Sequence, residues 1–140
     1  YRRGADIHPV PLSQYPIRNK TLYFKWKANG GGDFMGVGPR IFTDSVSWTM
    51  PYYPVNLTTH HSYLNSYVIT NDLWYYTRII MGATTYTATT ATGNYDNAGG
   101  TVVQTKTAAL DNDYRCLGFG LWDCYARTTA YTILNEVRIE

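Results

Sequence analysis

Apolar and polar residues alternate along much of this chain with a period of two, which is the period of a β-strand. The clearest case is residues 21–28, TLYFKWKA, where Leu22, Phe24, Trp26 and Ala28 share one face and tyrosine and lysine share the other. Since successive side chains of a strand point to opposite faces, we expect the apolar set to line a core and the polar set to face solvent.

Similar short segments follow, separated by turn-forming residues such as GNYDNAGG at 93–100. They are FMGVGPRIF (34–42), SYVIT (66–70), LWYYTRIIM (73–81), TTYTATTA (84–91), TVVQTKTAAL (101–110), CLGFGLW (116–122) and YTILNEVRIE (131–140). Eight or more short strands at this spacing predict an all-β, single-domain jelly-roll β-sandwich of antiparallel strands.

The two ends of the chain add two expectations to this prediction. Residues 1–19 hold three of the six prolines and no sustained alternation, so we expect an extended N-terminal arm before a β-sandwich domain at 20–140. In the last strand, Tyr131, Ile133, Val137 and Ile139 are predicted to share one face, interrupted only by Asn135.

Aromatic residues are abundant and charged residues are few. The chain has 14 Tyr, 4 Trp and 4 Phe, while only 16% of its residues are charged. A tyrosine or tryptophan ring combines an apolar face with a polar edge, which suits uncharged polar partners such as sugars. That these rings only fill a core and its rim remains an open alternative.

The net charge of the chain is small. Twelve Lys and Arg against ten Asp and Glu give a net charge of +2, and the basic residues are dispersed. We therefore expect neither nucleic acid nor an anionic membrane as a partner. We expect no membrane span either, because no window approaches the roughly 20 consecutive apolar residues that one requires.

Cys116 and Cys124 are the only cysteines. Two thiols without histidines at supporting spacing make a poor metal site, so a disulfide is the favoured prediction, with two reduced buried cysteines as the alternative. A disulfide implies an oxidising compartment and a secreted or surface-exposed, extracellular protein.

Several of these residues carry a family resemblance that covers roughly residues 20–140. Phe24 and Trp26, Trp74 with Tyr86, Gly118 and Gly120, and the closing NEVRI of residues 135–139 resemble the concanavalin A-like (LamG-type) lectin and glucanase superfamily. Asn135 departs from that family, which often has an aspartate at this place. The resemblance implies a concanavalin-like sandwich and a role in glycan binding, glycoside hydrolysis or adhesion.

The enzymatic alternative is disfavoured. Glycoside hydrolysis needs two carboxylates across the scissile bond, and glucanases that this chain resembles carry theirs in a Glu-x-Asp-x-Glu-like run. No such run occurs here, and the only two glutamates are Glu136 and Glu140. We therefore expect no catalytic activity.

Two aromatic groups are candidates for carbohydrate binding, because sugars need ring platforms beside amide or carboxylate groups. One lies in a long loop and the other in a turn that we expect near the loop after residue 121. The candidates are Trp48, Tyr52, Tyr53, Asn56, Tyr95, Asn97, Trp122 and Asp123. Tyr52 and Tyr53 are equally compatible with a rim position, and Trp74 is expected in the core.

Calcium is the one candidate cofactor. The resemblance implies that loop carboxylates bind this ion, and Asp96, Asp111 and Asp113 are the candidate ligands. Aspartate is also common in turns for backbone reasons alone.

The sequence thus predicts a non-catalytic, lectin-like module that binds a glycan or polysaccharide. The alternative is a structural subunit of an extracellular fibre, filament or phage appendage, which would contact copies of itself through the N-terminal arm.

Overall fold

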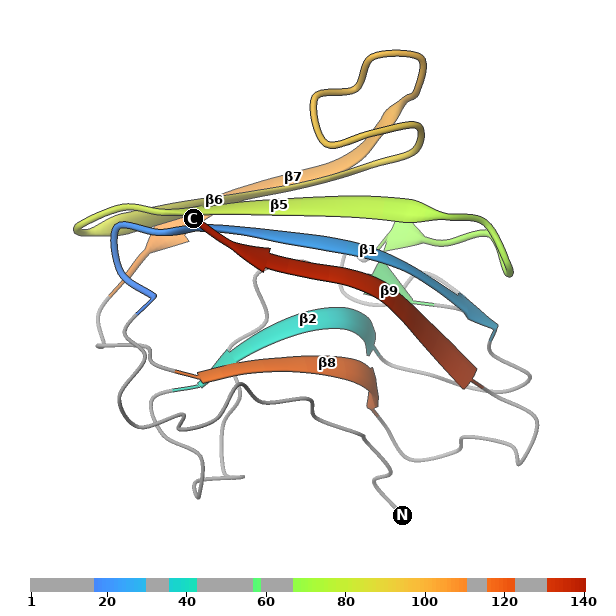
Figure 1. The fold of residues 1–140 in the computed structure, drawn as a ribbon, viewed down its shortest axis with the longest axis horizontal. Coiled ribbons are helices and arrows are strands. Elements are labelled where there is room, and N and C mark those ends of the chain that lie inside the picture. The colour runs from blue at the N-terminus through green and yellow to red at the C-terminus, as the bar shows by residue number, and fades with distance from the viewer. Residues whose placement is uncertain (1–16, 30–35, 43–56, 59–66, 111–115, 123–130) are drawn as a thin grey trace.

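The protein was analysed as a computed structural model, which describes residues 17–29, 36–42, 57–58, 67–110, 116–122 and 131–140 (Figure 1). In residues 36–42, 57–58 and 116–122 the description concerns the backbone. The described parts of the chain are all-β and contain no helix.

Strands occur within every segment that alternation marked. They are β1 (Thr21–Asn29), β2 (Gly36–Phe42), β3 (Leu57–Thr58), β4 (Tyr67–Val68), β5 (Tyr75–Met81), β6 (Thr85–Ala91), β7 (Val102–Ala109), β8 (Cys116–Trp122) and β9 (Tyr131–Ile139). The prediction of an all-β chain of short strands is therefore confirmed, and residues 93–100 form the expected turn region between β6 and β7.

Five strands form one antiparallel sheet in the order β7-β6-β5-β1-β9. β1 lies between β5 and β9, so the first and last described strands are neighbours. β2 pairs with β8 in a separate two-stranded ribbon, and β3 pairs with β4 in parallel. In Figure 1 the ribbon lies on one side of the five-stranded sheet and the β6–β7 loop rises from the other.

The predicted core face of β1 is confirmed. Leu22, Phe24, Trp26 and Ala28 are at most 1% exposed, and they pack with buried residues of the neighbouring strands. These neighbours include Tyr75, Ile79 and Met81 of β5 and Tyr86 and Ala88 of β6. We call this the inner face of the sheet and the opposite one the outer face.

A short polar chain crosses the inner face. The indole N–H of Trp26 donates to Thr77 Oγ1 at 3.0 Å, and Thr77 Oγ1 lies 2.8 Å from Thr90 Oγ1. Both threonines are fully buried, so these hydrogen bonds replace the water that the polar groups lose.

The predicted single face of β9 is wrong, because a β-bulge divides the strand. Lys25 pairs with Glu136 but Trp26 pairs with Leu134, which leaves Asn135 as an extra residue. An extra residue reverses the side-chain alternation beyond it. The register therefore places Val137 and Ile139 with the inner face, and Tyr131 and Ile133 with the outer face.

Candidate functional site

Aromatic and charged side chains gather on the outer face of β1, β5 and β9, together with one tyrosine from the β6–β7 loop. Strand register brings them side by side: Tyr23 lies between Arg78 and Arg138, and Lys25 lies between Tyr76 and Glu136. We call this set the outer-face cluster; it comprises Tyr23, Lys25, Lys27, Trp74, Tyr76, Arg78, Tyr95, Asp96, Glu136 and Arg138.

Trp74 anchors one end of the cluster. The Lys25 ammonium lies 5.3 Å from the centroid of its ring, and the Lys27 ammonium lies 5.1 Å from it. Lys25 also lies 5.5 Å from the Tyr76 centroid. The expectation that Trp74 belongs to the core is wrong: it precedes buried Tyr75, so the alternation turns its half-buried ring to the lysines of the outer face.

Tyr95 lies at the other end of the outer-face cluster. Its ring meets Tyr23 and Tyr76 edge-on, with centroids 5.1 and 5.3 Å apart, which is a favourable arrangement of ring quadrupoles. The Arg138 guanidinium lies 4.2 Å from the Tyr23 centroid and 5.8 Å from that of Tyr95. Rings and cation together fix the loop against the sheet.

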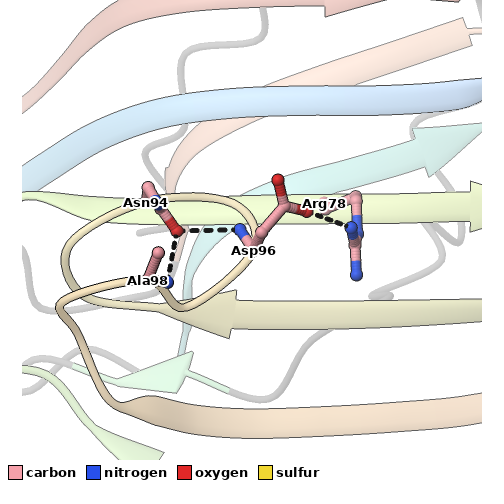
Figure 2. A network of polar contacts seen from close by, with 4 residues as sticks. All are labelled: Arg78, Asn94, Asp96 and Ala98. Atoms are coloured by element: carbon pink, nitrogen blue, oxygen red, sulfur yellow. Dashed lines mark hydrogen bonds and ion pairs between the residues drawn. The ribbon is translucent and has the colours of Figure 1, made fainter.

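Polar contacts hold the β6–β7 loop in this position (Figure 2). Asn94 Oδ1 accepts hydrogen bonds from the backbone N–H groups of Asp96 and Ala98 at 2.9 and 2.8 Å. Asp96 Oδ1 pairs with Arg78 Nη1 of β5 at 2.6 Å. The loop also requires Gly100, because a Cβ atom there would lie 1.5 Å from the carbonyl oxygen of Thr92.

The Tyr95 hydroxyl is in an unusual environment. Its oxygen is buried, and its interaction with Glu136 lacks the geometry of a normal hydrogen bond. Burial, followed by the negative charge of Glu136, raises the pKa of Tyr95 well above its usual value. The phenol therefore stays neutral and serves the cluster through its ring.

Hydrogen bonds join three polar residues near Trp74. Asn29 Nδ2 donates to Asp72 Oδ2 at 2.7 Å, and the Tyr131 hydroxyl donates to Asp72 Oδ1. These bonds, with the Tyr131 bond as the larger effect and the charge of Lys27 as a lesser one, lower the pKa of Asp72 below its ordinary value. Asp72 thus joins the ends of β1 and β9 to the turn before β5.

Most of the predicted site residues lie outside the described part of the chain. Outside the described residues lie Trp48, Tyr52, Tyr53, Asn56, Asp111, Asp113, Asp123 and Cys124. Cys116 and Trp122 are the first and last residues of β8, where the description concerns the backbone, so the Cys116–Cys124 disulfide stays a prediction. Roles for all these residues in binding also stay predictions.

Tyr95 and Asn97 do lie in the loop that the sequence singled out, but their expected neighbourhood is wrong. We expected this turn to sit beside Trp122. The loop instead contacts the outer face through Tyr23 and Tyr76, whereas β8, which ends at Trp122, lies on the other side of the sheet (Figure 1).

The candidate calcium ligand Asp96 is already paired with a cation, Arg78. Among the residues that the structure describes, no group of three or more His, Cys, Asp or Glu side chains could hold a metal ion. Asp111 and Asp113 are outside that part of the chain, so calcium binding stays a prediction.

Comparison with protein-family models, with curated proteins and with solved structures gives no match. Within the described ranges there is also no helix long and apolar enough to cross a membrane. Function must therefore be argued from the chemistry of the outer-face cluster.

Sequence reasoning assigned Lys25 and Lys27 to a solvent-facing surface but did not identify them as part of a site. The signal was partial: alternation in residues 21–28 indicates that these lysines share a face with Tyr23. Which rings they meet depends on the pairing of β1 with β5, and the sequence alone does not show that pairing.

Proposed function

We propose that this protein is a non-catalytic, extracellular carbohydrate-binding module, built as a concanavalin-like jelly-roll sandwich whose outer sheet face contacts the glycan. The observation that carries the proposal is the outer-face cluster, in which half-buried rings lie among groups that can hydrogen-bond sugar hydroxyls. Protein sites for sugars combine apolar ring surface with a few polar groups in this way. A secreted location and the Cys116–Cys124 disulfide belong to the same proposal.

The absence of catalysis is part of the proposal. Both glutamates of the chain lie beside one cation: Glu136 Oε1 is 3.8 Å and Glu140 Oε1 is 3.2 Å from Arg138 Nε. They are partly exposed on one strand and its end, an arrangement that favours surface ion pairs over an acid and base acting on opposite sides of a bond.

A glycan array with the full chain, followed by calorimetry on the best ligand, tests the proposal. We expect saturable binding that Trp74→Ala weakens about tenfold or more, since loss of a buried aromatic contact costs roughly 1–3 kcal/mol. Leu73→Ala is the matched control, because Leu73 is the preceding residue and is itself 41% exposed.

The candidate loop is tested in the same assay. The double variant Tyr52→Ala/Tyr53→Ala addresses the aromatic loop that the sequence singled out. Loss of binding in that variant but not in Trp74→Ala would transfer the site from the outer face to the loop. An array on which no glycan binds would overturn the proposed function.

A second candidate function, a structural or assembly subunit, has one specific observation in its favour. Within the described residues β9 is an edge strand of the sheet, and its apolar residues Ile133 and Val137 are 43% and 46% exposed. Exposed apolar side chains on a sheet edge favour pairing with another chain, including the proposed arm of a neighbouring copy.

Sedimentation of the full chain, of Val137→Thr and of a truncation lacking residues 1–15 tests assembly. A concentration-dependent oligomer that both changes dissolve, with the circular dichroism of each variant unchanged, would support the structural role. A full-length monomer over the whole concentration range would exclude it.

A further inference from the structure

We infer that the glycan bound by the outer face is anionic, and that its carboxylate or sulfate group binds between Lys25 and Lys27 beside Trp74. This inference rests on the proposed carbohydrate-binding function and adds the chemical class of the ligand. It depends on the position of two ammonium groups, those of Lys25 and Lys27, close to the ring of Trp74.

The two lysines both lie close to the aromatic ring of Trp74. Both ammonium groups lie close to the Trp74 centroid, at 5.3 and 5.1 Å, and both come from alternate positions of β1. The ring attracts each cation, but the cations repel each other. An anion that contacts both ammonium groups would relieve this repulsion and form charge-assisted hydrogen bonds.

No carboxylate of the described chain performs this role. Neither lysine forms an ion pair there, although Glu136 lies opposite Lys25 in the strand register. Glu136 instead lies beside Arg138, and both oxygens of Asp72 accept hydrogen bonds from Asn29 and Tyr131, so that Asp72 acts on Lys27 only through its charge and not as an ion-pair partner. Among the described residues, the positive charge at this end of the cluster is thus only partly offset, by Asp72, and a ligand anion can interact with it.

The arginine end of the cluster differs. Arg78 is paired with Asp96, and Arg138 lies within 4 Å of both Glu136 and Glu140. These cations are compensated within the protein, so an external anion gains less from them. Charge complementarity thus directs the anionic group of the ligand to Lys25 and Lys27.

Neighbouring side chains suit the rest of a sugar ring. Ile133 lies opposite Lys27 in the register and Tyr131 opposite Asn29; they are 43% and 40% exposed. This apolar surface can cover the C–H face of a pyranose while its acidic substituent meets the lysines. An acidic sugar uses both features, whereas a neutral sugar leaves the lysines without an anion.

The test compares three glycans by calorimetry: polygalacturonate for carboxylates, dextran sulfate for sulfates and dextran as a neutral polymer. We expect saturable binding of at least one anionic glycan, weaker as salt is added. Lys25→Gln/Lys27→Gln should reduce the affinity at least tenfold, because each charge-assisted hydrogen bond is worth about 1.5–3 kcal/mol. Lys25→Arg/Lys27→Arg should retain most of the affinity. The anionic glycan that binds identifies the acidic group that the lysines recognise.

Lys20→Gln is the matched control for Lys27→Gln, since it removes the same charge from an exposed position outside the cluster. Equal losses in these two variants would overturn the inference in favour of general electrostatic attraction. Binding of dextran that matches the anionic glycans and is unchanged in the double glutamine variant would overturn the inference while the proposed function stands. Binding of none of the three, together with a glycan array on which nothing binds, would overturn both.

Discussion

At the scale of single residues, the buried polar chain of Trp26, Thr77 and Thr90 is a feature of the core that is sensitive to substitution. Thr77 is central, since its hydroxyl accepts the indole N–H and also bonds Thr90. Polar groups in a fully buried position contribute little while paired but are costly when a partner is removed.

Replacing Thr77 with valine tests this feature. The change keeps the shape of the side chain but deprives Trp26 and Thr90 of their shared partner, so we expect a loss of about 2 kcal/mol in the free energy of unfolding. Denaturant titration measures it. Thr77→Ser, which keeps the hydroxyl, should cost about half as much; an equally large loss in the serine variant would show that packing of the methyl group is what matters.

Asp72 makes stability depend on pH. Its folded-state pKa lies below the ordinary value of 3.8, so the carboxylate form favours the folded protein. The stabilisation is present above the unfolded-state pKa and is lost as the pH falls through the folded-state pKa. Asp72→Asn should therefore be destabilising at neutral pH and indistinguishable from the parent in acid.

Asparagine is the suitable replacement, because Asp72 has a φ of 63° and asparagine tolerates this left-handed conformation. Isothermal denaturant titrations of both proteins across the acid range measure the difference. Tyr131→Phe, which removes the principal donor to Asp72, should lose much of the same pH dependence. A destabilisation by Asp72→Asn that is constant with pH would contradict this account.

At the scale of elements, the bulge at Asn135 decides which side chains of β9 join the core. It allows Leu134 to pack against the inner-face core while Ile133 joins the outer face. A regular register that paired Asn135 with Trp26 would reverse these two positions.

Deletion of Asn135 should consequently be tolerated, with a change of less than about 1 kcal/mol in the free energy of unfolding, because it leaves Leu134 opposite Trp26 and Glu136 opposite Lys25 in a regular ladder. Asn135→Ala, which keeps the residue count, should cost less than about 1 kcal/mol. Thermal or denaturant unfolding of the two variants and the parent measures both changes. A loss of more than about 2 kcal/mol in the deletion variant would show that the bulge itself stabilises the strand, beyond the faces that it assigns to Leu134 and Ile133.

At the scale of the whole molecule, strand order determines which parts open most easily. β6, β5 and β1 have a neighbouring strand on each side, whereas β7 and β9 are the edges of the five-stranded sheet. Local opening of an edge strand breaks one ladder of hydrogen bonds, but opening of a central strand breaks two.

Hydrogen exchange followed by mass spectrometry tests this order. Peptides from residues 21–29, 75–81 and 85–91 should exchange most slowly, and peptides from 102–109 and 131–139 should exchange faster. The comparison is internal, since all peptides come from one sample. Protection of β9 equal to that of β5 would indicate that another chain or segment covers the β9 edge, as the assembly alternative requires.

The sequence was a good guide to strands and a poor guide to the site. Alternation in β1 correctly marked Leu22, Phe24, Trp26 and Ala28 as core, because the period of a strand is a local property. It misplaced Trp74, whose flanking segment is apolar on both faces, and it joined the two halves of β9 that a bulge separates. The loop around Tyr95 was recognised, but not the surface that it contacts.

The sequence by itself determined that this protein is built from short strands, and it determined which face of β1 is buried, because both follow from the spacing of apolar side chains along one strand. Only the tertiary structure decided that β1 lies between β5 and β9, strands far from it in the chain. That pairing brings Lys25 and Lys27 to Trp74, and Tyr95 to Tyr23 and Tyr76. Strand pairing and bulges depend on contacts between distant segments, and the pattern within any single segment does not contain them.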